Sequence, residues 1–183
     1  MATTISDKEL VRQLQDKSQR ERAFRLLVQQ YQERLYWHIR RMVMEHEDAN
    51  DVVQNTFIKV YRSIDNFKGQ SKLYTWLYRI ATNESITFLN KKKRQVAESM
   101  DQPDYNLSEK LRADSYVDGD AIQRKLQAAI ATLPEKQRLV FNMRYYDEMS
   151  YQDISEVLDK SVGGLKASYH HAVKKIEKYL KNM

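Results

Sequence analysis

Apolar residues recur at three- and four-residue steps along most of this chain, the spacing that places them on one face of an α-helix. The pattern is clearest over residues 21–45, where one stripe runs along an otherwise charged segment: Phe24, Leu27, Val28, Tyr31, Leu35 and Ile39. No Asn-Gly or Asp-Gly hairpin lies between alternating apolar runs, because the Asp118-Gly119 pair falls in a polar stretch. The pattern therefore predicts an all-α fold.

The first three predicted helices follow one another with short interruptions. Ser6-Asp7-Lys8-Glu9 has the spacing of a capping box and opens a short helix that ends near Asp16. The long helix at 21–45 comes next, and the polar segment 46–48 breaks its stripe. A third helix then shows an apolar side (Ala49, Val52, Val53, Phe57, Val60) and a polar side (Asp48, Asp51, Asn55, Lys59, Arg62).

A fourth helix is predicted from a turn at residues 66–71 to about Lys93, with Ser71 as its N-cap. Its inward side carries Leu73, Leu77, Ile80, Ala81, Glu84 and Phe88, and an aromatic and basic cluster surrounds its start: Phe67, Tyr74, Trp76, Tyr78, Arg79 and Asn83. One helix cannot turn all of these aromatic rings inward, so we expect at least one to face solvent. A stacked, unpaired base would gain about 1–3 kcal/mol there, and the Asn83 amide could read the edge of an extruded base. The alternative is that these rings belong to the core.

The second half of the chain predicts three short helices separated by tight stops, followed by a longer one. The predicted helices cover residues 121–131, 134–146 with Pro134 at the first position, 151–158 capped by Ser150, and a last helix capped by Ser161. The predicted core positions of the first and last of these are Ile122, Leu126, Ala129, Ile130 and Leu133, and Leu165, Tyr169, Ala172, Ile176 and Leu180. This order is typical of a helix-turn-helix, whose last helix lies in a DNA major groove.

The outward face of the last helix combines cations with small or planar groups: Lys166, Ala167, His170, His171, Lys174 and Lys175. Cations of this kind neutralise phosphates, whereas contacts to base edges specify sequence. The alternative is a solvated cationic face. Because the whole three-helix pattern agrees, we favour contact with DNA.

Charge divides the chain into three segments. Residues 1–97 carry 18 Lys and Arg against 11 Asp and Glu, residues 98–120 carry 2 against 7, and residues 121–183 carry 11 against 7. We therefore predict two basic helical domains, 1–97 and 121–183, joined by a flexible acidic linker at 98–120. The basic domains favour phosphate partners, and the acidic linker should avoid DNA unless it is simply a polar tether.

Enzyme and metal chemistry find little support in the sequence. The chain has no cysteine, its four histidines lack zinc-ligand spacing, and no Gly-rich phosphate loop or nucleophile elbow is present. We predict no catalytic residue, no metal and no cofactor. The N-terminus lacks the plan of a signal peptide, and no apolar run approaches membrane-spanning length. We therefore expect a cytoplasmic protein with no membrane insertion.

Several fragments, in order and spacing, resemble an extracytoplasmic-function (ECF) sigma factor of the sigma-70 family. They are residues 48–57, Phe67-Lys68-Gly69-Gln70-Ser71 with residues 75–83, Leu133–Arg138 and Ser150–Ile154. The resemblance implies a promoter-specificity subunit of bacterial RNA polymerase, with promoter DNA, the polymerase β′ coiled coil and β flap, and a possible anti-sigma factor as partners. It also implies that the linker threads the RNA-exit path of the polymerase.

The resemblance assigns three groups of residues. Polymerase docking falls to Asp48, Asp51, Gln54 and Asn55; the −10 element to Phe67, Lys68, Ser71, Lys72, Tyr74, Trp76, Arg79 and Asn83; and the −35 element to Ser161, Gly163, Lys166, Ala167, His170, His171 and Lys174. The chain departs from the family where Gly164, Ala167, Ser168 and Val173 replace the usual Thr, Ser, Arg and Arg, and where Asn50 replaces an acid. These changes predict weaker or unusual −35 contacts.

Two other functions fit part of the sequence. A polymerase-independent helix-turn-helix regulator, with the first domain as an effector or dimerisation module, explains the second domain but leaves the aromatic cluster without a role. An RNA-binding helical protein is compatible with the charge alone. We favour the sigma factor because it accounts for both halves.

Overall fold

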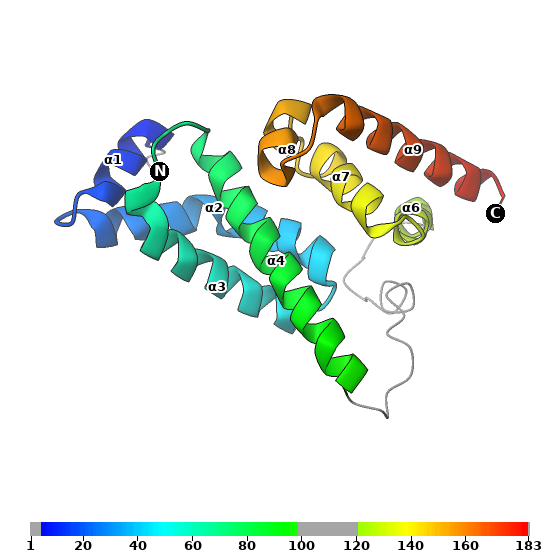
Figure 1. The fold of residues 1–183 in the computed structure, drawn as a ribbon, viewed down its shortest axis with the longest axis horizontal. Coiled ribbons are helices and arrows are strands. Elements are labelled where there is room, and N and C mark those ends of the chain that lie inside the picture. Colours follow the sequence, from blue (N-terminus) through cyan, green and yellow to red (C-terminus); the bar gives the residue numbers. More distant parts are fainter. Residues whose placement is uncertain (1–4, 99–120, 183) are drawn as a thin grey trace. The chain divides into compact units, whose positions relative to one another are not determined.

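The computed structural model describes residues 5–98 and 121–182. Within these ranges the chain forms eight α-helices, one short 3-10 helix and no strand, so the predicted all-α class is confirmed (Figure 1). The chain divides into two compact units after Asn90, within the fourth helix, and each unit is described by itself. The predicted linker lies outside the described residues except for Glu98, so its bounds and those of the two domains remain predictions.

The N-terminal unit holds the four predicted helices. They are α1 (Asp7–Gln15), α2 (Arg20–Val43), α3 (His46–Ser63) and α4 (Leu73–Glu98), with the 3-10 helix η1 (Ile64–Asn66) after α3. Met44 ends α2 in the left-handed conformation, with φ of 71°. Several predicted bounds differ from the structure. α2 ends at Val43 rather than near residue 45, and the segment 46–48, predicted to break the helices, is the first turn of α3. α4 continues past Lys93, and its first backbone bond, from Trp76 N–H to the Lys72 carbonyl, places the cap at Lys72 rather than Ser71.

The start of α1 shows half of the predicted capping box. The Ser6 hydroxyl accepts from the Glu9 backbone N–H at 3.3 Å, as an N-cap should. The Glu9 carboxylate does not complete the box by turning back; it accepts from the side chains of Arg12 (2.6 and 2.9 Å) and Gln13 (2.7 Å). These bonds, that from Arg12 above all, lower the pKa of Glu9 to about 2.

The core of this unit comes from the predicted stripes. The largest contributors with almost no exposed surface are Leu10, Leu14, Leu27, Leu35, Ile39, Ile64, Leu77 and Tyr78. Burying each such side chain contributes about 1.5–3 kcal/mol to the free energy of unfolding. One polar contact lies among them, where His38 Nε2 and the Thr82 hydroxyl are 2.9 Å apart and join α2 to α4. The His38 ring also lies 4.8 Å from the Tyr78 ring.

The C-terminal unit contains α6 (Ala121–Ala131), α7 (Glu135–Tyr145), α8 (Tyr151–Leu158) and α9 (Val162–Lys181). Both predicted serine caps are present: Ser150 accepts from the Asp153 N–H at 3.0 Å, and Ser161 accepts from the Gly164 N–H at 3.2 Å. Pro134 is the N-cap of α7 rather than its first residue. Asp159, with φ of 52°, stops α8 and lets the chain turn into α9.

The core of the C-terminal unit joins α6, α7 and α9 through a small set of buried residues: Ala129, Ile130, Leu133, Phe141, Ala172 and Ile176. Two positions predicted to be buried are exposed. Ile122 is 75% exposed because the first five residues of α6 lie outside this core, and Leu180 is 39% exposed in the last turn of α9. Among the described residues, no helix combines the length and apolarity that crossing a membrane requires.

We predict that Ser150→Ala lowers the free energy of unfolding of the C-terminal unit by about 1 kcal/mol, because the helix α8 loses its N-cap. Urea unfolding followed by circular dichroism should show the change. Both tryptophans, Trp37 and Trp76, lie in the N-terminal unit, so the tryptophan fluorescence transition should not move.

The matched control is Gln152→Ala, an exposed side chain in the first turn of α8, which should change the free energy of unfolding by less than about 0.5 kcal/mol. Equal effects of the two substitutions would contradict the capping role of Ser150.

Candidate nucleic-acid interface

The turn between η1 and α4 is held by α1 and the start of α2. The Gln15 side-chain amide donates to the carbonyls of Ile64 (3.2 Å) and Phe67 (2.8 Å), and Arg20 forms an ion pair with Asp65. Gly69 occupies the middle of the turn with φ of 69°, a conformation that favours glycine. The start of the loop that leads into α4 is therefore held by α1 and α2.

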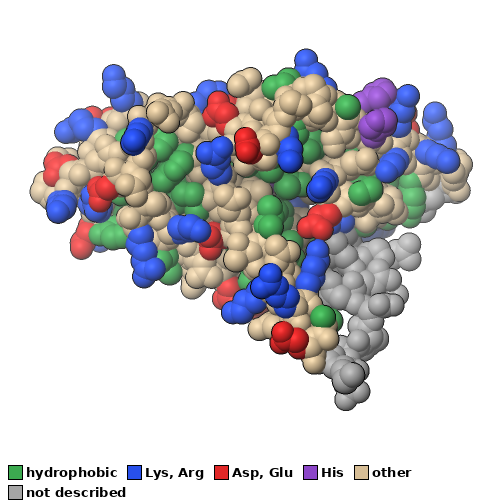
Figure 2. Space-filling view, in the orientation of Figure 1, with side chains coloured by type: hydrophobic (Ala, Val, Ile, Leu, Met, Phe, Trp, Pro, Cys, Tyr) green, Lys and Arg blue, Asp and Glu red, His purple; other side chains and the backbone are tan. Residues whose placement is uncertain are grey.

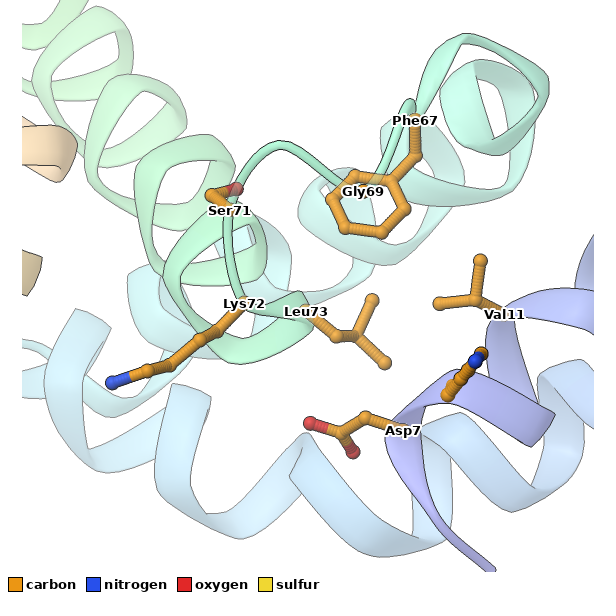
Figure 3. Close-up of a pocket in the computed structure, with 8 residues that line it drawn as sticks. Asp7, Val11, Phe67, Gly69, Ser71, Lys72 and Leu73 are labelled. Carbon is orange, nitrogen blue, oxygen red and sulfur yellow. The ribbon is translucent and has the colours of Figure 1, made fainter.

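A pocket of about 410 Å³ opens beside this turn. Its walls come from two elements distant in sequence: Asp7, Lys8 and Val11 of α1, and Phe67, Gly69, Ser71, Lys72 and Leu73 of the turn and the start of α4 (Figure 3). The volume lies in the range of small-ligand sites, which combine apolar walls with a few polar groups.

The structure distributes the predicted −10 residues between this pocket and the outward side of α4. Phe67 is only 8% exposed, and its ring centroid lies 5.0 Å from that of Trp76, so Phe67 forms a pocket wall and not a free platform. Tyr74, Trp76 and Ser71 are half-buried, whereas Lys68, Lys72, Arg79 and Asn83 are exposed. Tyr78 is in the core. Tyr74 and Trp76 therefore keep part of their surface in solvent, and Phe67 and Tyr78 do not.

The predicted docking residues lie on one side of α3. Asp51, Gln54 and Asn55 are exposed and Asp48 is half-buried. The same helix exposes two large apolar side chains that the sequence analysis missed, Ile58 (48%) and Tyr61 (39%). Ile58 directly follows the buried Phe57 and therefore lies outside the predicted apolar stripe of the helix. That position could have identified Ile58 as an exposed apolar residue from the sequence. Exposed apolar side chains beside acids are typical of a protein-binding surface.

The predicted −35 residues share the exposed side of α9 and its cap. Ser161, Gly163, Lys166, Ala167, His170, His171 and Lys174 are all exposed. Figure 2 shows histidine side chains among Lys and Arg side chains over α9. The His170 and His171 ring centroids are 6.2 Å apart.

Sequence reasoning missed an aromatic neighbour of this face on α8. The Lys166 Nζ lies 5.9 Å from the centre of the Tyr151 ring, and the Arg144 guanidinium lies 5.1 Å from the same ring. Cations at such distances are attracted by the face of an aromatic ring. Two cations therefore lie near the Tyr151 ring, beside the last helix. In the sequence, only the position of Tyr151 in the first turn of α8, next to the Ser150 cap, pointed to this arrangement.

In the described part of the chain, no group of three or more His, Cys, Asp or Glu residues could hold a metal ion. The described residues present three candidate interfaces: an acidic and apolar side of α3, a pocket with exposed cations around it, and a cationic side of α9. Each of them suits a macromolecular partner, and the last two suit phosphates.

Comparison with known proteins agrees with both units. The Sigma-70 region 2 family matches residues 27–95, and the Sigma-70 region 4 family matches residues 123–176. The ECF RNA polymerase sigma-E factor of Haemophilus influenzae is 34% identical to this chain over 97% of its length and 96% of the relative. The ECF RNA polymerase sigma factor SigW of Bacillus subtilis is 33% identical over 88% of this chain and 90% of the relative.

Two solved structures share the fold. One is CnrH in complex with the cytosolic domain of CnrY, with a TM-score of 0.71 and 21% identity over 96% of this chain and 97% of that one. The other is the sigma factor RpoE in complex with the anti-sigma factor NepR from Bartonella quintana, with a TM-score of 0.69 and 22% identity over 86% of this chain and 96% of that one. With both helical units matched in order and relatives aligned over nearly its full length, the chain belongs to the ECF sigma factors of the sigma-70 family, transcription initiation factors that direct RNA polymerase to promoters and are not enzymes.

Proposed function

We propose that the N-terminal unit docks on core RNA polymerase and holds the unpaired strand of the −10 element, while the C-terminal unit lies on the duplex of the −35 element. The observation that carries the proposal is that two separate units match sigma-70 regions 2 and 4 in order, and each presents exposed cations outside its core. As a sigma factor, the chain would act in the cytoplasm, with the polymerase and the chromosome.

Docking on the polymerase is assigned to the exposed side of α3. Asp51, Gln54 and Asn55 supply polar and acidic contacts to the β′ coiled coil, with Asp48 at the edge. Ile58 and Tyr61 extend this side with apolar area that a partner would bury. Burial of this apolar area would strengthen the binding, whereas the acidic side chains would orient the partner and speed association.

Capture of the −10 strand is assigned to the pocket beside the Phe67–Leu73 turn and to the outward side of α4. Lys68, Lys72 and Arg79 would neutralise phosphates of the strand, and Asn83 would hydrogen-bond to a base edge. A base that leaves the stack loses a few kcal/mol of stacking and pairing, which a fitted pocket with polar contacts can restore. Strand opening is thus driven by binding of bases and needs no chemical step.

Recognition of the −35 element is assigned to α9. Lys166 and Lys174 would contact phosphates, while His170 and His171 are the planar groups that can reach base edges. Ala167 offers only a methyl group, and Gly163 and Gly164 offer no side chain. The free energy of binding at −35 should therefore come mainly from phosphate contacts. Their contribution to the affinity decreases as the salt concentration rises.

Each unit alone offers few contacts, so the isolated chain should bind promoters weakly. Polymerase would hold the two units at a set separation, and the second contact would then form at a high effective concentration. An anti-sigma factor could oppose this by covering the exposed side chains of α3 and α9. The fold neighbour RpoE of Bartonella quintana, solved in complex with the anti-sigma factor NepR, supports that partner class.

We predict that Asp51→Arg weakens binding to core polymerase at least tenfold, because an exposed docking acid is replaced by a cation. Fluorescence anisotropy of the labelled chain titrated with core polymerase measures the change. Glu33→Arg, an equal charge reversal at an exposed position of α2, is the control and should bind like the wild type.

This pair of variants also separates the two functions considered above. A polymerase-independent regulator would show no difference between Asp51→Arg and Glu33→Arg, and it would bind duplex DNA tightly without polymerase.

We also predict that Lys166→Ala, assayed as holoenzyme, weakens promoter binding about equally across −35 sequences. The slope of log K against log salt should become shallower by about one, because one phosphate contact is lost. Lys125→Ala, an exposed lysine of α6 that is assigned to no interface, should leave the slope unchanged. A change confined to one −35 sequence would mean that Lys166 reads a base.

A further inference from the structure

The pocket beside the Phe67 turn has a wall from α1 that the family resemblance did not assign. Asp7 lies in this wall, and its Oδ1 accepts a hydrogen bond from the Tyr31 hydroxyl at 2.8 Å. Tyr31 is buried, and burial together with the bond to Asp7 raises the pKa of its hydroxyl. The hydroxyl therefore stays a donor at neutral pH, and Asp7 is held in place by a fixed group of the core.

The other lining groups suit a flat ring with a polar edge. Val11, Phe67 and Leu73 give apolar surface (Figure 3). Lys8 adds a cation to the lining, whereas the Lys72 ammonium points away from these side chains and lies 5.5 Å from the centre of the Tyr74 ring. Among the described residues that line the pocket, Asp7 is the one acid. Tyr31 occupies one carboxylate oxygen, and the second oxygen keeps its capacity to accept hydrogen bonds.

We propose that Asp7 selects the base in this pocket by accepting a hydrogen bond from an exocyclic amine, so that the pocket takes cytosine, adenine or guanine in preference to thymine. This inference rests on the proposed capture of an unpaired −10 base. It adds a specificity-determining residue on α1, a helix outside the turn and α4.

The preference follows from the hydrogen-bonding edges of the bases. Cytosine, adenine and guanine each present an amine whose hydrogens a carboxylate can accept, and Asp or Glu accepting from cytosine N4 is a known pairing. Thymine has no amine, and two carbonyl oxygens flank its single N–H. A carboxylate facing those oxygens would oppose acceptor to acceptor with no hydrogen between them, which is unfavourable.

The competing explanation is that Asp7 only supports the fold, as a partner of Tyr31 and as an acid at the N-terminus of α1. Asp7→Asn separates the two roles. The amide keeps an oxygen that can accept from Tyr31, but it also brings an N–H₂ donor that can pair with the carbonyls of thymine. A structural role would change stability without changing which base is preferred.

The experiment uses holoenzyme assembled with the full chain and forked duplexes whose single-stranded −10 segment is randomised, followed by sequencing of the bound pool. For the wild type, one position should disfavour thymine about tenfold or more. Asp7→Asn should lower that discrimination to less than about threefold at the same position only. Glu9→Gln, the matched acid of α1 outside the pocket, should keep the wild-type profile.

A second measurement needs no variant and so does not depend on folding. On the preferred fork, the selected base is replaced by its analogue without the amine, 2-pyrimidinone for cytosine, purine for adenine or hypoxanthine for guanine. The wild-type holoenzyme should then bind about tenfold more weakly. An unchanged affinity, or an unchanged profile for Asp7→Asn, would overturn the role of Asp7. Failure of the proposed function looks different: wild-type holoenzyme would bind forks no better than closed duplex, with no base enriched at any position.

Discussion

The rotation of α4 about its axis is the constraint on which the N-terminal unit depends. Leu73, Leu77 and Tyr78 turn one side of this helix into the core. The hydrogen bond between His38 and Thr82 adds a buried polar contact with α2 that only one rotation satisfies. Such a bond contributes about 1 kcal/mol to the free energy of unfolding. A buried partner left without it lowers the free energy of unfolding by about 1–3 kcal/mol. With that side fixed, Arg79 and Asn83 must point to solvent.

In the C-terminal unit, too, one side of a helix packs in the core and the other side faces solvent. Ala172 and Ile176 place one side of α9 against α6 and α7, so the side with Lys166, His170 and Lys174 remains open. The serine caps and the left-handed Asp159 set where α8 stops and α9 begins. In both units most candidate binding residues lie outside the core, and Phe67 is an exception because it is buried. Binding surfaces built in this way are held rigid by packing on the opposite side of the helix.

Hydrophobic periodicity predicted the helices well because burial of one side is the dominant local signal. The stripe of α2 and the serine caps at Ser150 and Ser161 are read directly from the chain. Less predictable were features set by contacts distant in sequence. Phe67 belonged to a cluster in which we expected at least one ring to face solvent, but it packs beside Trp76, and Ile122 was predicted to be buried but lies beyond the core of its unit. The role of Asp7 in a pocket depends on Gln15 holding a turn some fifty residues away, which no local pattern reveals.

In the proposed function, a small sigma factor directs transcription by binding alone. One unit would bind exposed bases, the other would rest on duplex phosphates, and polymerase would supply the geometry that makes both contacts possible at once. The most direct test is transcription by core polymerase with and without the purified chain on sheared DNA from its source organism, with the 5′ ends of the transcripts sequenced. We expect chain-dependent start sites downstream of a shared two-part motif. Absence of any chain-dependent start, while the chain alone protects specific closed duplex, would contradict the account.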